Sequence, residues 1–154
     1  MRWLRFLTSV FRCFGEEFGE RRHEAEEALL LVRKAFVIVI YHLWERGAQR
    51  WIPAVRKKPN HSHLVAALTE ASIVIDKVGL EELRLLVNCL KHNSEDARKL
   101  YALRRDLFAA DFDPDDIHPA TGKPLVKVDW AEKVVLTDDN VEGYLRVIQD
   151  SGPK

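Results

Sequence analysis

Apolar residues recur every three or four positions along most of the chain, which is the spacing of one face of an α-helix. The longest such pattern runs from about Glu20 to Ile52, where no proline interrupts it, and Pro53 follows directly. Acidic residues crowd its first turns, which suits the positive end of a helix dipole. Its middle, residues 29–44, is apolar nearly all round, so we expect this helix to be central to the fold.

Four further helical patterns precede residue 109. They cover about residues 1–14, 63–78, 80–92 and 95–108. Gly15 follows the first of them, Gly79 is expected to end the second, and Ser94 is placed to cap the last. The fold class that follows is mainly α, with a helical bundle of about five helices over residues 1–108.

The pattern changes after residue 108. Residues 111–124 are rich in Asp, Pro and Gly and are typical of a surface loop. Residues 125–136 alternate in part and are rich in valine, which predicts a short β-hairpin-like segment. Thr137 is placed to cap a final helix, with acidic residues in its first turn. We expect residues 109–154 to be an acidic C-terminal extension packed on the same domain.

Charge is balanced over the whole chain but not along it. The 154 residues suit one domain, and their formal net charge of zero gives no global attraction to nucleic acid. Residues 1–58 hold 12 Lys and Arg against 7 Asp and Glu, whereas residues 109–154 hold 5 against 10. Either the acidic tail packs near the basic surface, or the N-terminal region binds a polyanion.

Cysteine usage and hydropathy bear on location. Cys13 and Cys89 lack any metal-ligand or CxxC spacing, so we expect buried free thiols in a reducing, cytoplasmic setting. The apolar stretch of residues 35–44 is far shorter than the roughly 20 residues that a membrane span needs. The amphipathic helix at residues 1–14 could lie on a membrane, but we expect it to pack on protein.

One helix carries a polar row on an otherwise apolar pattern. Arg84, Asn88 and His92 are spaced four apart and share one face, with Lys91 beside them. They supply two cations, an amide and an imidazole that titrates near neutrality. Such groups can hold a phosphodiester and move its protons, and the chemistry requires no metal ion or cofactor.

A second polar group lies on the long helix, where His42, Glu45 and Arg46 fall within one turn. A carboxylate deep in a central helix needs a basic partner, and Arg84 or His92 is the expected source. Bonded to His92, Glu45 would fix the imidazole tautomer and raise its pKa. The structural alternative is a plain ion pair between Glu45 and Arg84, with His92 merely ending its helix.

Three segments carry a family resemblance. These are YHLWE at residues 41–45, LRLLVNCLKHNS at 83–94 and KLYALRRDLF at 99–108, and together they resemble uncharacterised bacterial proteins of the HEPN-like class. The resemblance implies a helical bundle over about residues 24–108 that forms a homodimer, and often metal-independent RNase activity in toxin–antitoxin or phage-defence systems. His92 would be the signature histidine and Glu45 its supporting acid. The signature usually has its arginine nearer in sequence to the histidine than Arg84 is to His92. Asn88 is the polar residue at the nearer spacing.

The sequence therefore predicts a protein that binds RNA or cleaves it without metal. Arg84 and Lys91 would hold phosphate, His92 would act as general acid and base, Asn88 would position the substrate, and Glu45 would orient His92. The alternative is a non-catalytic interaction module in a hetero-complex with an operon-encoded protein. Two weaker motifs, His61-Ser62-His63 and the acidic run at residues 111–116, are not expected to bind metal.

Overall fold

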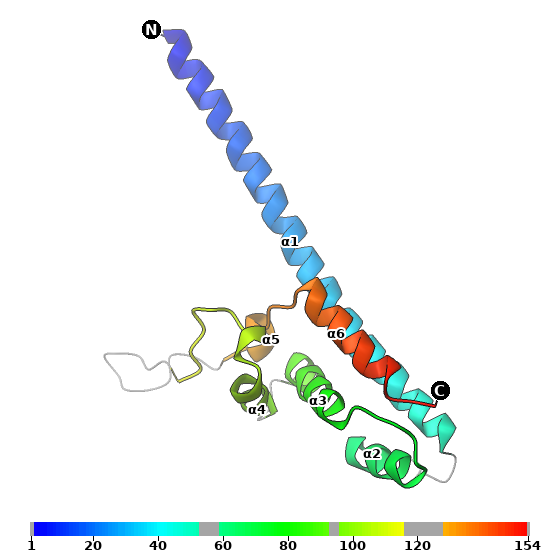
Figure 1. Ribbon diagram of the computed structural model, residues 1–154. Helices are drawn as coiled ribbons and strands as arrows, with labels where there is room; N and C mark the ends of the chain where they lie inside the picture. Colours follow the sequence, from blue (N-terminus) through cyan, green and yellow to red (C-terminus); the bar gives the residue numbers. More distant parts are fainter. Residues whose placement is uncertain (1, 53–58, 93–95, 116–127, 154) are drawn as a thin grey trace. The chain divides into compact units, whose positions relative to one another are not determined.

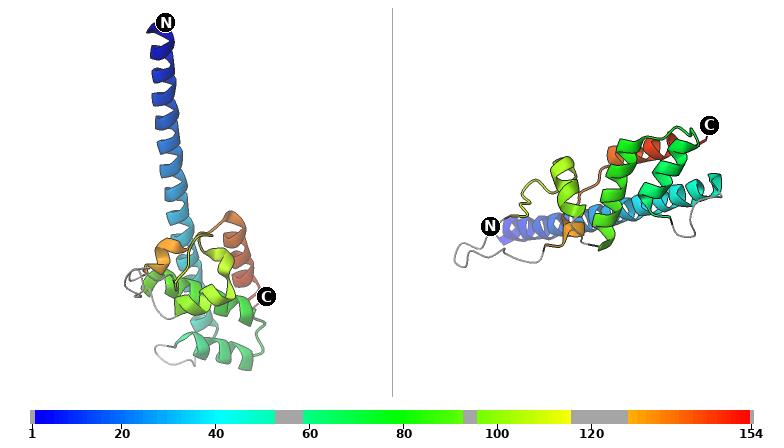
Figure 2. Two further views of the ribbon diagram at one scale, coloured as in Figure 1. Left: turned by 90° about the vertical axis from the view of Figure 1, so that its left-hand side faces the viewer. Right: turned by 90° about the horizontal axis from the view of Figure 1, so that it is seen from below.

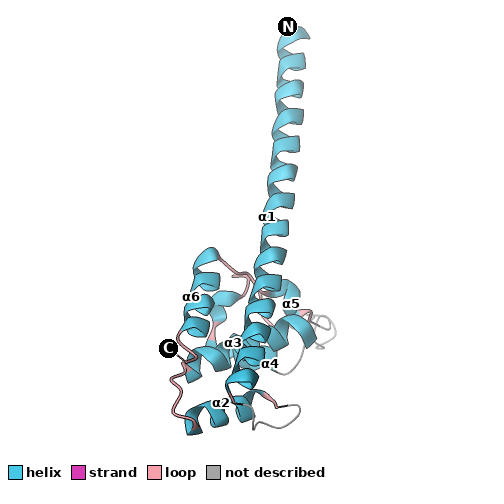
Figure 3. Ribbon diagram, turned by 90° about the vertical axis from the view of Figure 1, so that its right-hand side faces the viewer, coloured by secondary structure: helices cyan, strands magenta, loops and turns pink. Residues whose placement is uncertain are grey.

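The computed structural model describes residues 2–52, 59–92, 96–115 and 128–153, with side chains from residue 19 onward. Its helices are α1 (Arg2–Trp51), α2 (His61–Glu70), α3 (Lys77–His92), α4 (Asp96–Leu103), the 3-10 helix η1 (Arg105–Leu107), α5 (Trp130–Lys133) and α6 (Asp138–Gln149) (Figure 1). The described residues contain no strand (Figure 3). The protein is therefore mainly α-helical, as predicted.

The chain divides into two compact units, residues 1–32 and 33–154. The first unit consists of the opening part of α1, which is helical through Gly15 and Gly19, where the sequence predicted a break. Each helical glycine costs only about 1 kcal/mol relative to alanine, so two of them weaken the helix without ending it. All contacts described below lie within the second unit.

Helix α6 runs alongside the part of α1 that belongs to the second unit (Figures 1 and 2). The Arg33 guanidinium lies 2.8 Å from the Asp138 carboxylate at one end. At the other end, the buried Trp44 indole donates a 2.9 Å hydrogen bond from Nε1 to the Ser151 carbonyl. The two helices therefore run in the same direction, and Trp44 is a core residue with its polar atom satisfied.

The inner face of α3 forms the middle of the core. Leu80, Leu83, Leu86 and Val87 are at most 1% exposed, and α3 contacts α4, α5 and α6. Burial also raises the pKa of the Cys89 thiol on this helix to about 12, so the thiol stays protonated. It is a buried free cysteine, as expected, whereas the side chain of Cys13 lies outside the described residues.

The boundary between α2 and α3 differs from the prediction. Helix α2 ends at Glu70, and α3 already begins at Lys77, so Gly79 lies inside a helix rather than ending one. The Asp76 carboxylate accepts a 2.9 Å hydrogen bond from the Gly79 amide and caps the start of α3. A Cβ atom at Gly79 would lie 2.5 Å from Val147, so glycine allows α6 to approach closely.

The β-hairpin prediction is wrong for the described part of residues 125–136. Residues 130–133 form α5 because the Asp129 carboxylate accepts hydrogen bonds from the amides of Ala131 and Glu132, which is an N-cap. The valine-rich alternation that suggested a strand yields one isolated bridge, between Phe108 and Val134. Residues 125–127, Ser94 and Asp116 lie outside the described residues.

The final helix begins as predicted. Thr137 caps α6 and forms a reciprocal capping box with Asn140, and acidic side chains occupy the first turn. Among the described residues, no helix is long and apolar enough to cross a membrane.

Candidate functional site

The predicted polar row lies on the outer face of α3. Arg84 and Asn88 both donate to the same oxygen, Asp96 Oδ2, at 3.0 and 2.9 Å, so they share a face as the spacing predicted. Lys91 and His92 follow in the last turn, and both are exposed. The opposite face of α3 is the buried leucine-rich one, which fixes the orientation of this row.

Arg84 is held by two carboxylates. Its Nε and Nη2 donate to the two oxygens of Glu81 at 2.8 and 2.7 Å, and its Nη1 reaches Asp96. This fork on a carboxylate is the geometry that guanidinium groups favour. The hydrogen bonds to Glu81 raise the pKa of Arg84, so it stays charged. Two negative charges therefore oppose its positive charge, and only two of its N–H groups are left for another anion.

Asn88 helps to fasten α4 to α3. Its amide donates to Asp96, and Lys99 lies 3.1 Å from the other oxygen of that carboxylate. These contacts, with the Asn88 hydrogen bond as the largest cause, lower the pKa of Asp96 to about 2. Asp96 is the first residue of α4, so this cluster anchors the start of that helix.

Glu45 has a different partner from the two that the sequence suggested. Its Oε2 accepts a 2.7 Å hydrogen bond from Nδ1 of His42, and neither Arg84 nor His92 is bonded to it among the described residues. The reason is local geometry, because residues three apart on a helix have side chains within reach of each other. The prediction that Glu45 orients His92 is therefore wrong for this arrangement. The histidine that Glu45 orients is His42.

The second nitrogen of His42 faces a cation. Lys91 Nζ lies 3.3 Å from His42 Nε2. An ammonium can only donate, so Nε2 accepts and the ring proton is assigned to Nδ1, which faces Glu45. The His42 and Glu45 side chains are 39% and 24% exposed, so the imidazole is held in place yet reachable from solvent. We call the His42–Glu45 dyad, together with the adjacent Lys91, the dyad cluster.

His92 lies outside this cluster. It is exposed at the C-terminal end of α3, and no described residue forms a hydrogen bond or ion pair with its ring. A protonated imidazole there would interact favourably with the negative end of the helix dipole. The signal that identifies His42 instead is the three-residue spacing within YHLWE, which places histidine and glutamate on one helix face.

A second histidine, His61, is drawn into a neighbouring network. The Tyr41 hydroxyl lies 2.9 Å from His61 Nδ1, and His61 Nε2 lies 3.6 Å from the Glu81 carboxylate. Burial raises the pKa of Tyr41 and lowers that of His61, so both are neutral at physiological pH. This network ties α1, α2 and α3 together.

In the sequence, His61 belongs to the weak His61-Ser62-His63 motif, and the structure makes it the first residue of α2. Its neighbour His63 is exposed, and its amide donates to the Asn60 side chain in the cap of α2, while no described residue bonds to its ring. Within the described ranges, no group of three or more His, Cys, Asp or Glu side chains could hold a metal ion.

The comparisons with known proteins add no relative. No family model matches the chain, and no curated protein and no solved structure matches it. The resemblance to HEPN-like proteins therefore stays a prediction from the sequence.

Proposed function

We propose that the protein binds RNA and cleaves it without a metal ion, at the dyad cluster. The observation that carries the proposal is the 2.7 Å contact between His42 Nδ1 and Glu45 Oε2, with Lys91 Nζ 3.3 Å from His42 Nε2. A histidine general base requires a carboxylate on one ring nitrogen and a lone pair on the other, and the lone pair of His42 Nε2 becomes free when Lys91 turns to the phosphate.

The proposed reaction is attack of a ribose 2′-hydroxyl on the adjacent phosphorus. His42 takes the 2′-proton through Nε2 as the O2′–P bond forms, and Glu45 stabilises the resulting imidazolium. Lys91 turns to the phosphate and balances the charge of the transition state. As the P–O5′ bond breaks, His92 supplies a proton to the leaving oxygen, which keeps its predicted role as an acid. The products are a 2′,3′-cyclic phosphate and a 5′-hydroxyl.

Arg84 and Asn88 have a supporting role in this proposal. Their hydrogen bonds to Asp96 use donors that the sequence assigned to phosphate and substrate. Their contribution is to hold α4 against α3 and so to fix the backbone that presents Lys91. We therefore expect substitutions of these two residues to act first on stability.

The direct test is cleavage of a labelled single-stranded RNA by the full chain in the presence of EDTA. The His42→Ala variant should lose at least about 100-fold in rate, which is the usual contribution of a general base. His63→Ala, which alters an exposed histidine on α2, is the matched control and should cleave normally. Thermal unfolding of both variants should stay close to that of the parent. Equal cleavage by His42→Ala and the parent would refute the proposal.

A second function is favoured by a different observation. Phe36, Val39 and Leu43 on α1 are 41%, 52% and 58% exposed, and their spacing of three and four places them on one stripe. Exposed apolar patches of this kind mark protein–protein interfaces. This favours a non-catalytic interaction module, and the expected homodimer would bury the same stripe.

Oligomeric state and RNA cleavage, measured together, separate the two proposals. Analytical ultracentrifugation should find a dimer for the parent and a monomer for Leu43→Glu, with unchanged thermal unfolding. If the parent associates in this way but leaves RNA intact, the interaction module is the better account. A monomeric parent that cleaves RNA would favour the catalytic account alone.

A further inference from the structure

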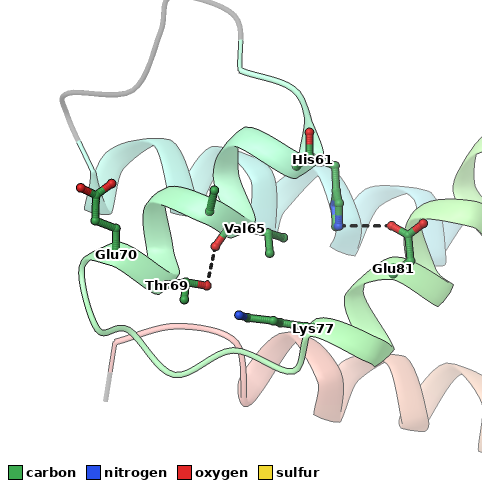
Figure 4. A pocket seen from close by; sticks show the side chains of 8 residues that line it. His61, Val65, Thr69, Glu70, Lys77 and Glu81 are labelled. Carbon is green, nitrogen blue, oxygen red and sulfur yellow. Dashed lines mark hydrogen bonds and ion pairs between the residues drawn. The ribbon is translucent and has the colours of Figure 1, made fainter.

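A pocket of about 600 Å³ lies between α2 and the first turns of α3 (Figure 4). The residues that line it and matter here are Ser62, Val65, Ala66, Thr69, Glu70 and Lys77. Its size is within the range of small-molecule and cofactor sites. It is separate from the dyad cluster, and nothing in the proposed reaction uses it.

The lining combines an apolar patch with one cation. Val65 and Ala66 on α2 supply apolar surface. The Lys77 side chain reaches into the pocket from the start of α3 (Figure 4), and no described residue pairs with its ammonium. An unpaired lysine at the edge of an apolar patch is suited to a phosphate or carboxylate of a ligand.

The other polar groups of the pocket are acceptors. The Ser62 hydroxyl donates its proton to Asn60 at 2.8 Å, and the Thr69 hydroxyl donates to the Val65 carbonyl at 2.7 Å. Only lone pairs of these two oxygens are then left for a ligand. Glu70, at the end of the pocket away from His61 (Figure 4), is a further acceptor, and no described residue pairs with it.

The wall near His61 is nearly neutral. The Glu81 carboxylate there is already held by Arg84, and the hydrogen bonds from Arg84 lower the pKa of Glu81. A ligand for this pocket therefore needs one anionic group for Lys77 and several hydrogen-bond donors for the acceptors. It also needs a flat apolar part for the α2 surface.

We propose that this pocket binds one nucleotide of an RNA strand, with a preference for bases that carry an exocyclic amino group. The phosphate lies on Lys77, the base covers Val65 and Ala66, and Glu70 accepts from the amino group, as carboxylates do from cytosine N4. Ribose hydroxyls supply the donors for Ser62 and Thr69. The inference rests on the proposed RNA function and extends it to substrate selection.

The geometry of α3 links the pocket to the dyad cluster. Lys77, Glu81, Arg84, Asn88 and Lys91 are spaced three or four apart and share one face of the helix. The fourteen residue steps between the two lysines correspond to about 21 Å along the helix axis. A strand of a few nucleotides that follows this face would contact both ends, so the pocket selects a base a few positions from the cleaved bond.

The test compares CMP with UMP, which differ at C4 by an amino group in place of a carbonyl. Calorimetric titration of the full chain should find CMP bound at least about 10-fold more tightly than UMP. Glu70→Gln should remove this preference, and Lys77→Met should weaken CMP but leave cytidine unchanged. Lys133→Met, an exposed lysine on α5 outside the pocket, is the matched control and should bind as the parent does.

Any one of three results would overturn the inference. The first is that CMP does not bind even at 10-fold above the concentration that saturates typical weak sites. The others are that CMP and UMP bind equally, or that Lys77→Met binds CMP as tightly as the parent does. The catalytic proposal is tested separately with His42→Ala, which should bind CMP like the parent. If the parent binds CMP selectively but does not cut RNA, the pocket stands and the catalytic proposal falls. If the parent cuts RNA but binds CMP and UMP equally, only the proposal for the pocket is refuted.

Discussion

Two polar clusters lie along one face of α3, and they differ in how completely their charges are satisfied. In the first, Arg84 is enclosed by Glu81 and Asp96. In the dyad cluster, one ring nitrogen of His42 is hydrogen-bonded to Glu45, and the other has only a longer contact with the exposed Lys91. A cluster whose charges are paired stabilises the fold but has few free hydrogen-bonding groups for a ligand. A cluster that is only partly paired and is accessible to solvent can exchange protons.

The largest expected difference between the two clusters comes from replacing a glutamate by glutamine in each. Glu45→Gln should lower the RNA cleavage rate by about 100-fold, because the imidazolium loses its counter-charge. Glu81→Gln should leave the rate per folded molecule unchanged and lower the unfolding temperature instead. Single-turnover cleavage with excess enzyme, together with thermal unfolding, measures both. If the two variants lose activity equally, the distinction between the clusters fails.

Removing the charge at the centre of the first cluster should cost stability. Arg84→Met leaves Glu81 and Asp96 without their shared partner, and we expect a loss of about 2 kcal/mol in the free energy of unfolding. For a chain of this length that is a drop of about 5 °C in the unfolding temperature. Urea denaturation checks the value. Arg98→Met removes an exposed ion pair with Asp115 and should change little.

Lys91 should behave in the opposite way to Arg84. Lys91→Met is expected to lower cleavage about 10-fold and to make RNA binding less dependent on salt, since one phosphate contact is lost. Its side chain is exposed, so the unfolding temperature should hardly move. Fluorescence anisotropy of a labelled RNA between 50 and 200 mM KCl tests this, and an unchanged salt slope would contradict the assignment.

The smallest expected effect concerns acid. The pKa of Asp96 in the folded protein is lowered to about 2, chiefly by the Asn88 hydrogen bond. A lowered folded-state pKa adds stability above the ordinary value of roughly 3.9, and this part is lost as pH falls towards 2. Asp96→Asn should therefore flatten the decline of stability between about pH 4 and pH 2. Urea midpoints across that range measure it, and parallel curves for variant and parent would contradict it.

The sequence allowed good predictions wherever a local pattern decides the structure. The central helix, the shared face of Arg84 and Asn88, and the Thr137 cap all follow from spacing and capping within a few residues. The partner of Glu45 is also local, because His42 lies three residues before it on the same helix. The prediction instead looked for a basic partner on α3, where Arg84 and His92 were both chemically acceptable.

Other errors come from contacts between distant parts of the chain. The start of α3 depends on Asp76, whose amide donates a 2.9 Å hydrogen bond to the Ser151 hydroxyl, 75 residues away. The valine-rich segment before Thr137 has the alternation of a strand, yet its described part pairs in strand fashion only at one isolated bridge, between Val134 and Phe108. Periodicity gives the face that a residue occupies, whereas the partner of that face comes from distant parts of the chain.

The hydrogen bonds of Ser151 affect the order in which parts of the chain can fold during synthesis. Its carbonyl accepts from the Trp44 indole, and its hydroxyl accepts from the Asp76 amide. The first of these contacts spans 107 residues. On a ribosome, Trp44 therefore emerges long before its partner does, and contacts of such high sequence separation form slowly. The nascent chain must carry an uncovered tryptophan face for most of its translation, which makes α1 the segment that a chaperone would be expected to shield.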